Sequence, residues 1–217
     1  MAAMTSSPLD PLHLAALAAA DPKLKPITER FSHIIYRQRE GGFTALLRLI
    51  VEQQLSVKAA DTITARLHAG LGEVSAKALL AHDDDLMRGY GLSRPKIAYA
   101  RALAEAIDSG AFDVEALREM ETEAAAQKLI ALKGIGRWTA EVYLMFSEGR
   151  LDLFPVGDIA LREAVGWLDG LSERPNEAYC AERTRVWSPY RSIGAHLMWA
   201  WYGAVRRGEM ERGTIPA

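Results

Sequence analysis

The sequence contains a single cysteine, Cys180, among its 217 residues. One cysteine excludes an intrachain disulfide framework and a four-cysteine ligand set for zinc or an iron-sulfur cluster. No apolar run approaches the roughly 18 residues that a membrane-spanning helix needs, so no membrane partner is expected. The short run LHLAALAAA, Leu12 to Ala20, follows no lysine or arginine, which favours a first helix over a signal peptide. We therefore expect a reduced protein of the cytoplasm, or of the nucleus in a eukaryote, that is not secreted.

The chain also lacks a strong net charge, because 26 basic residues face 28 acidic ones for a formal charge of -2. This balance argues against a protein that coats nucleic acid by bulk electrostatics. The charges are unevenly spread, since five arginines and no acidic residue occur between Arg183 and Arg207. Such runs are typical of solvated helix faces and are equally compatible with local basic faces.

Alternating strand patterns of useful length are missing as well, whereas apolar residues recur at helical spacing along most of the chain. The pattern predicts an all-α protein, and the absence of a low-complexity linker favours one domain, 1–217, over two independent ones. We expect two lobes, the first over about 42–150 and the second over about 1–41 plus 151–217. The expected helices, separated by Gly, Ser, Asp and Pro, are 11–20, 43–54, 56–71, 75–81, 84–89, 94–109, 114–120, 122–132, 137–147, 159–168, 175–186 and 189–202.

The stretch LIALKGIGRWTAEVYLMF, Leu129 to Phe146, places two glycines one residue apart between two apolar runs. Gly134 can adopt positive φ and end the first helix, while Gly136 lets the backbone approach another group closely. Ile135 between them is expected to pack into the helix pair. The second helix then begins with free amide N–H groups, which together with the helix dipole form an anion site suited to a phosphate. By geometry alone such a turn is more often a purely structural one.

The longer pattern LKGIGRWTA resembles the helix-hairpin-helix element of the DNA glycosylase superfamily, and the resemblance covers about Gly42 to Tyr202. It implies a two-lobed helical glycosylase fold, here without the N-terminal β domain of some members. It also implies that the hairpin, 129–146, grips the DNA backbone, with a K⁺ or Na⁺ ion at the carbonyls of Leu132 and Gly134. The residues assigned to this grip are Leu132, Lys133, Gly134, Gly136 and Arg137.

A Pro-Val-Gly turn delivers Asp158 immediately before an amphipathic helix, which predicts an N-cap. In the superfamily that this chain resembles, an aspartate after such a stretch is catalytic, and the two roles are compatible because N–H groups stabilise an ionised carboxylate. Breaking an N-glycosidic bond builds positive charge on the deoxyribose, which a fixed carboxylate can stabilise. Asp158 is the expected catalytic residue, and Asp152 is the weaker candidate.

Superfamily members that also cut the strand through a Schiff base place a lysine two positions after the second hairpin glycine. Trp138 occupies that position here, and Lys133 inside the hairpin is a poor substitute. The resemblance therefore implies a monofunctional enzyme that leaves an abasic site, with no redox cofactor.

Two further segments resemble parts of related glycosylases that handle the target base. In IVEQQLSVKAADTITARL, Gln54 matches the side chain that fills the gap left by a flipped-out nucleotide, and the adjacent Leu55 is the alternative. The aromatic stretch WSPYRSIGAHLMWAWYG resembles the C-terminal helix of the 3-methyladenine DNA glycosylase II, or alkylpurine, type. Trp199 and Trp138 match pocket tryptophans of that branch, where an indole stacks well on a cationic purine. Without the hairpin, an ordinary turn and ordinary core packing explain both segments equally well.

The sequence thus predicts a monomeric DNA glycosylase of base excision repair that binds damaged double-stranded DNA and releases 3-methyladenine and 7-methylguanine. Some of Arg183, Arg185 and Arg191 are expected to add phosphate contacts. Two alternatives stay open: a glycosylase of the same fold for deaminated, oxidised or mismatched bases, and a DNA-binding module without catalysis.

Overall fold

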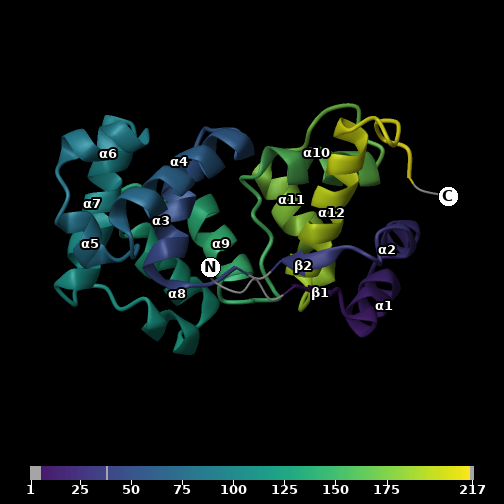
Figure 1. Cartoon of the computed structure of the whole chain (residues 1–217). Helices are drawn as coiled ribbons and strands as arrows, with labels where there is room; N and C mark the ends of the chain where they lie inside the picture. The colour runs from purple at the N-terminus through teal and green to yellow at the C-terminus, as the bar shows by residue number, and fades with distance from the viewer. Residues whose placement is uncertain (1–5, 38, 216–217) are drawn as a thin grey trace. The chain divides into compact units, whose positions relative to one another are not determined.

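The computed structural model describes residues 6–37 and 39–215, and this part of the chain is predominantly helical (Figure 1). Residues 1–5, 38 and 216–217, which the expected second lobe includes, lie outside the described residues. The all-α prediction is confirmed with one addition: β1 (Ser6–Pro8) and β2 (Ile35–Arg37) pair antiparallel. Strands of three residues are too short to produce an alternating sequence pattern, so no signal pointed to them.

The described residues fall into two compact units, 39–148 (unit 1) and 6–37 together with 149–215 (unit 2). Unit 1 is a continuous piece of chain, and unit 2 is assembled from two pieces. No helix in the described ranges is both long and apolar enough to cross a membrane.

Unit 1 is built around α3 (Gly42–Glu52), which packs against α4 (Val57–Leu71), α7 (Arg94–Asp108) and α9 (Arg137–Phe146) (Figure 1). Apolar residues at helical spacing explain this position, because Leu46 and Ile50 lie one turn apart on α3 and are fully buried. The other elements of unit 1 are α5 (Ala76–Leu80), α6 (Asp84–Tyr90), the 3₁₀ helix η2 (Glu115–Glu119) and α8 (Thr122–Ile130).

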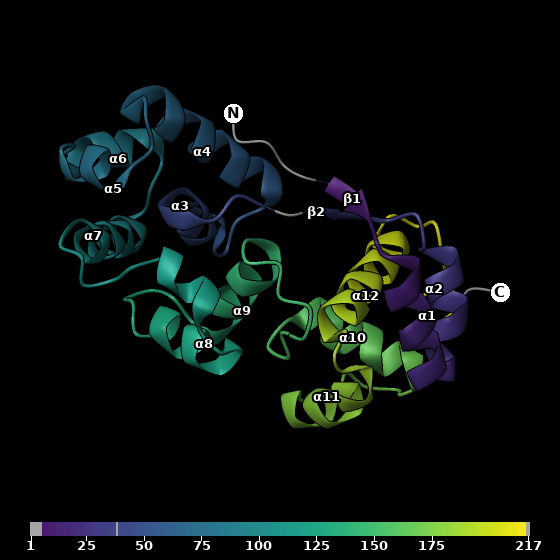
Figure 2. The same cartoon turned by 90° about the horizontal axis from the view of Figure 1, so that it is seen from below.

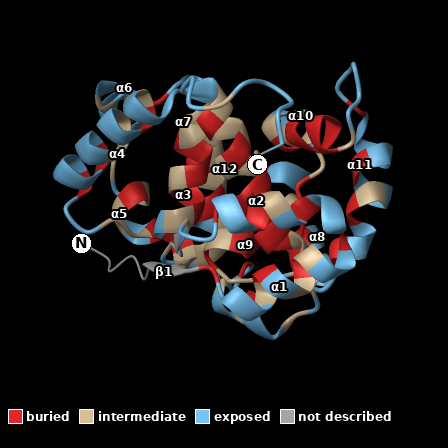
Figure 3. Ribbon diagram, turned by 90° about the vertical axis from the view of Figure 1, so that its right-hand side faces the viewer, coloured by how far each residue is buried: buried red, intermediate tan, exposed pale blue. Residues whose placement is uncertain are grey.

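Unit 2 is built around α12 (Arg191–Arg206), which packs most extensively against α10 (Ile159–Leu168). Both helices carry buried residues along most of their length (Figure 3), and Trp201 is fully buried. The other elements of unit 2 besides β1 and β2 are α1 (Pro11–Ala20), η1 (Pro22–Leu24), α2 (Lys25–Arg30), α11 (Glu177–Arg183) and η3 (Thr184–Trp187).

Most helices begin within one residue of the position that the sequence predicts, and a side chain caps the first amides of several of them. The Asp10 carboxylate accepts a hydrogen bond from the Leu12 amide, and the Ser56 hydroxyl accepts one from the Ala59 amide. Three expectations need correction. The helix expected over 114–120 is the 3₁₀ helix η2, the helix expected over 175–186 is divided into α11 and η3, and α2 has no counterpart among the expected helices.

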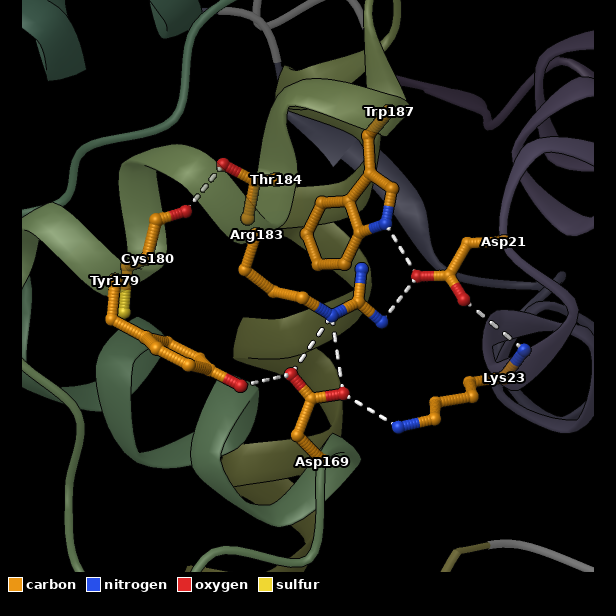
Figure 4. A network of polar contacts seen from close by, with 8 residues as sticks. All are labelled: Asp21, Lys23, Asp169, Tyr179, Cys180, Arg183, Thr184 and Trp187. Carbon is orange, nitrogen blue, oxygen red and sulfur yellow. Dashed lines mark hydrogen bonds and ion pairs between the residues drawn. The ribbon is translucent and has the colours of Figure 1, made fainter.

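A buried polar network joins the two pieces of unit 2 (Figure 4). The guanidinium of Arg183 donates to Asp21 at 2.6 Å and to Asp169 at 2.8 Å. Asp21 also accepts the indole N–H of Trp187 at 2.8 Å, and Asp169 accepts from Lys23 at 2.8 Å. Both carboxylates are largely buried, so each is stabilised by charged and neutral donors rather than by water.

This network makes the stability of unit 2 pH-dependent. Burial opposes ionisation of Asp169, but hydrogen bonds from Lys23, Arg183 and Tyr179 outweigh it and hold the pKa of Asp169 below its ordinary value. A lowered pKa in the folded state stabilises the fold fully above the ordinary aspartate pKa, and this stabilisation is lost as the pH falls through the lowered value. We expect urea unfolding at a series of pH values to show this loss, and Asp169→Asn to remove part of it. The matched control is the exposed Asp113→Asn; equal acid dependence in both variants would contradict the assignment.

Candidate active site

The hairpin expected over 129–146 is present, and α8 and α9 lie side by side within unit 1 (Figure 2). The turn is closed by the Leu132 amide, which donates to the Leu129 carbonyl, and by the Ile135 amide, which donates to the Leu132 carbonyl. Ile135 is buried, as the sequence predicts. Gly136 is the N-cap of α9 and makes no side-chain hydrogen bond to the first turn of the helix.

The two hairpin glycines are required for different reasons. Gly134 has a φ of 86°, and a Cβ at this position would overlap the ring of Tyr99 on α7. Gly136 has a φ of -90°, and a Cβ there would meet no atom of the described residues within 4 Å. Packing inside the protein therefore explains Gly134, whereas Gly136 is a favoured N-cap residue with open space where a Cβ would lie.

The substitution Gly134→Ala is expected to lower the free energy of unfolding by about 2 to 4 kcal/mol, because it combines a strained backbone with overlap on Tyr99. Thermal and urea unfolding measure this loss. Gly136→Ala is the matched control and is expected to unfold close to the wild type. Equal stability of the two variants would show that Tyr99 does not enforce glycine at position 134.

The two basic residues of the hairpin differ in their surroundings. Lys133 is exposed, whereas Arg137 donates from both terminal nitrogens to Glu123 at 2.7 and 2.8 Å and from Nε to Glu141 at 2.7 Å. Its hydrogen bonds are the main cause that lowers the pKa of Glu123 to about 2, so this pair is ionised throughout the neutral range. The phosphate contact expected of Arg137 stays a prediction, and it would add a third acceptor to a guanidinium that already bridges two carboxylates.

The expected wedge residues lie in the turn between α3 and α4. Gln54 and Leu55 are both exposed, and Gln54 is the one described residue other than glycine with positive φ, at 56°. The neighbouring Gln53 donates from Nε2 to the Gly134 carbonyl at 2.9 Å. This hydrogen bond joins the turn to the hairpin.

Lys96 on α7 is a contributor to this region that the sequence did not indicate. Its ammonium donates to the carbonyls of Val51 at 2.6 Å and Gln53 at 2.7 Å. The role of Gln53 could have been suspected from its position beside Gln54, whereas Lys96 lies 43 residues further along the chain from Gln53 and carries no local signal.

The expected catalytic aspartate is the N-cap of α10 in unit 2. Oδ1 of Asp158 accepts the Leu161 amide at 3.0 Å, and the Asp158 amide donates to the Pro155 carbonyl at 2.9 Å, so the turn fixes the backbone on both sides of the carboxylate. Asp158 is half-buried. Its weaker competitor Asp152 forms an ion pair with Arg191 at 2.7 Å and accepts the hydroxyl of Ser188 at 2.9 Å, which gives it a structural task.

The arginines expected to assist with phosphates are also bound to carboxylates. Arg183 lies in the network of Figure 4, Arg191 holds Asp152, and the exposed Arg185 pairs with Glu182 at 2.9 Å. Their phosphate contacts stay predictions. Acidic residues from other parts of the chain, or from the preceding turn, thus offset the positive charge of these three arginines.

The two pocket tryptophans lie on different units. Trp138 is in the first turn of α9 in unit 1 and is 37% exposed. Trp199 is on α12 in unit 2, half-buried, with its ring perpendicular to that of His196 at a centroid distance of 5.8 Å. Burial lowers the pKa of His196, so a neutral imidazole lies against Trp199. The role of these two indoles in one base pocket stays a prediction.

The carbonyls expected to hold a monovalent cation each accept a hydrogen bond in this structure. The Leu132 carbonyl accepts the Ile135 amide at 3.1 Å, and the Gly134 carbonyl accepts the Gln53 amide. The described residues also contain no cluster of His, Cys, Asp or Glu arranged for a metal. These two carbonyls do not form a cation ligand set by themselves, and the cation stays a prediction.

Residues 47–189 match the HhH-GPD superfamily, which is described as a base excision DNA repair protein superfamily. This match spans more than half of the sequence and includes the hairpin, Asp158, Trp138 and the wedge turn. The chain belongs to this superfamily. With this membership and this helical fold, the chain is a DNA glycosylase of base excision repair.

Three of the matches to known proteins and structures have names in keeping with this family. A DNA-3-methyladenine glycosylase 1 of Schizosaccharomyces pombe is 28% identical over 192 residues, which cover 87% of this chain and 84% of that protein. The crystal structure of a DNA-3-methyladenine glycosidase from Bacillus halodurans aligns with a TM-score of 0.86 at 32% identity, covering 98% and 97% of the two chains. A 3-methyladenine DNA glycosylase of S. pombe in complex with abasic DNA aligns with a TM-score of 0.79 at 26% identity, covering 94% of this chain and 99% of that one.

Proposed function

We propose that this glycosylase removes alkylated purines, 3-methyladenine and 7-methylguanine, from double-stranded DNA by hydrolysis and acts as a monomer. The observation that carries the proposal is Trp138, a half-exposed indole in the first turn of α9, at the hairpin position where strand-cutting relatives place a lysine. The similar proteins named for 3-methyladenine support the choice of base.

The proposed reaction begins when the hairpin binds a phosphate. Amides at the start of α9 donate to the phosphate with the help of the helix dipole, and Gly136 permits close approach. The damaged nucleotide leaves the base stack, and Gln54 or Leu55 fills the gap. In this way backbone groups bind a feature common to all DNA, while side chains select the lesion.

The chemical step is assigned to Asp158. As the bond between C1′ and the purine nitrogen breaks, its electron pair moves to the purine and positive charge develops on the sugar. The carboxylate of Asp158 stabilises this charge and accepts a hydrogen bond from the water that adds to C1′. The N-cap geometry holds the carboxylate in place before the substrate arrives, so little reorganisation is needed.

Selection of alkylated purines is assigned to the indoles of Trp138 and Trp199. Alkylation at N3 or N7 makes the purine cationic, and a cation gains about 0.5 to 2 kcal/mol over an indole face relative to a neutral ring. Alkylation also weakens the glycosidic bond, so a carboxylate without a strong general acid suffices.

The proposal is tested by a base-release panel on duplexes that each contain one lesion. 3-Methyladenine and 7-methylguanine are expected to be released, and uracil, hypoxanthine and 8-oxoguanine are expected to be retained. Borohydride should trap no covalent complex with the DNA, because position 138 has no amine. Release of a deaminated or oxidised base alone would indicate a different pocket specificity, and binding without release of any base would indicate a DNA-binding module.

A further inference from the structure

The turn that carries Gln54 is held in a conformation that its own sequence disfavours. Gln54 has a φ of 56°, and a side chain with a Cβ disfavours this left-handed region unless neighbouring contacts hold it there. Gln54 and Leu55 are exposed, so packing of their own side chains does not supply the restraint. The restraint must come from the residues on either side of the turn.

One restraint acts on the backbone at the end of α3. The last carbonyls of a helix have no partners within the helix, and here Lys96 supplies them from α7. Its ammonium is 2.6 Å from the Val51 carbonyl and 2.7 Å from the Gln53 carbonyl, and hydrogen bonds from a charged donor are stronger than neutral ones. The chain is therefore fixed on the residue immediately before Gln54.

A second restraint joins the turn to the hairpin. The side-chain amide of Gln53 donates to the Gly134 carbonyl at 2.9 Å, and Gly134 itself lies against the ring of Tyr99. Tyr99 and Lys96 are three residues apart on α7 and therefore share a face of that helix. The same face of α7 thus supports both the end of α3 and the hairpin turn.

We propose that Lys96 and Gln53 are positioning residues that hold Gln54 and the hairpin as one rigid element, which fixes the distance between the wedge and the bound phosphate. The proposal rests on the proposed function and takes Gln54, rather than Leu55, as the side chain that enters the base stack. In a rigid element, the Gln54 side chain enters the base stack at a fixed distance from the bound phosphate. If the turn were loose, the hairpin would still bind the phosphate, but Gln54 would not fill the gap left by the flipped-out nucleotide.

The primary test uses Lys96→Met, which keeps the unbranched stem and removes the donors. The exposed Lys77→Met on α5 is the matched control, because it removes the same charge from the same unit. At saturating enzyme, Lys96→Met is expected to lower the single-turnover rate of 3-methyladenine release about ten-fold, since small misplacements of this kind are costly. Affinity for a duplex with a tetrahydrofuran abasic-site analogue is expected to change less than about three-fold, because the hairpin contacts remain.

A double-mutant cycle with Gln54→Ala separates positioning from a general structural role. If Lys96 acts through Gln54, Lys96→Met has almost no further effect on the rate once Gln54 is alanine. The proposal would be overturned if the two substitutions lowered the release rate independently, so that their fold-reductions multiplied in the double variant. A wild-type release rate in Lys96→Met would also overturn it. Gln53→Met removes only the link to Gly134 and gives the same test if Lys96→Met does not fold.

A fluorescence measurement makes the outcome independent of base release. In a duplex with 2-aminopurine beside the tetrahydrofuran site, insertion of Gln54 changes the stacking and hence the emission. Wild type and Lys77→Met are expected to give the full change, and Lys96→Met only the residual change of Gln54→Ala. A failure of base release in the wild type would refute the proposed function alone, whereas a full emission change in Lys96→Met would refute the positioning role.

Discussion

Asp158→Asn is expected to reduce the single-turnover rate of base release about a hundred-fold, in line with the loss of one fixed electrostatic contact to a charged transition state. Asparagine keeps the shape of the side chain and retains an oxygen that accepts the Leu161 amide, and it is as good an N-cap as aspartate. The variant should therefore fold and bind an abasic duplex normally. What it lacks is the negative charge opposite the developing cation.

The control for this prediction is Asp152→Asn. Asp152 lies in the same loop and is bound by Arg191 and Ser188, so its loss should lower stability and leave the rate of release within a few-fold of the wild type. Near-normal release by Asp158→Asn, or a greater loss in Asp152→Asn, would remove Asp158 from the mechanism. The measurement is release of 3-methyladenine from alkylated duplex DNA at saturating enzyme.

Arg183→Met is expected to lower the free energy of unfolding by about 3 to 5 kcal/mol, because it leaves two largely buried carboxylates without their shared cation. Lys23 and Trp187 remain as donors, but neither bridges Asp21 and Asp169 as the guanidinium does. Urea unfolding is the appropriate measurement, since base release reports on the folded fraction only.

Arg185→Met is the matched control for Arg183. Arg185 is two residues away and pairs with Glu182 on the surface, where solvent screening leaves such a pair little effect on stability. A loss of stability in the Arg185 variant as large as that in the Arg183 variant would show that the shared factor is net charge and not the buried network.

The sequence predicted those features whose cause is local. Gly134, the buried Ile135 and the N-cap at Asp158 each follow from a few adjacent residues, because turn and cap geometry depends on the identity of those residues. The helix over 159–168 was predicted to the residue for the same reason. Short elements such as α2 and the two strands were missed because six or three residues contain too little periodicity.

Features that depend on distant partners could not be predicted. Arg137 was expected to be available for phosphate, and the structure pairs it with Glu123, 14 residues earlier in the chain. The positive φ of Gln54 depends on Lys96, whose position opposite the end of α3 is set by how α7 packs. Side-chain pairing of this kind follows from tertiary structure, and a single sequence without homologues carries no record of it.

The discontinuous construction of unit 2 also determines the order in which the protein can be built during synthesis. Residues 39–148 contain the whole of unit 1, so every partner within it exists before α10 is translated. Asp21, by contrast, accepts a hydrogen bond from Trp187, which is translated 166 residues later. The helices that precede unit 1 in the chain thus reach some of their native contacts only after all of unit 1 has been translated, and the hairpin unit can be complete before the unit that carries Asp158.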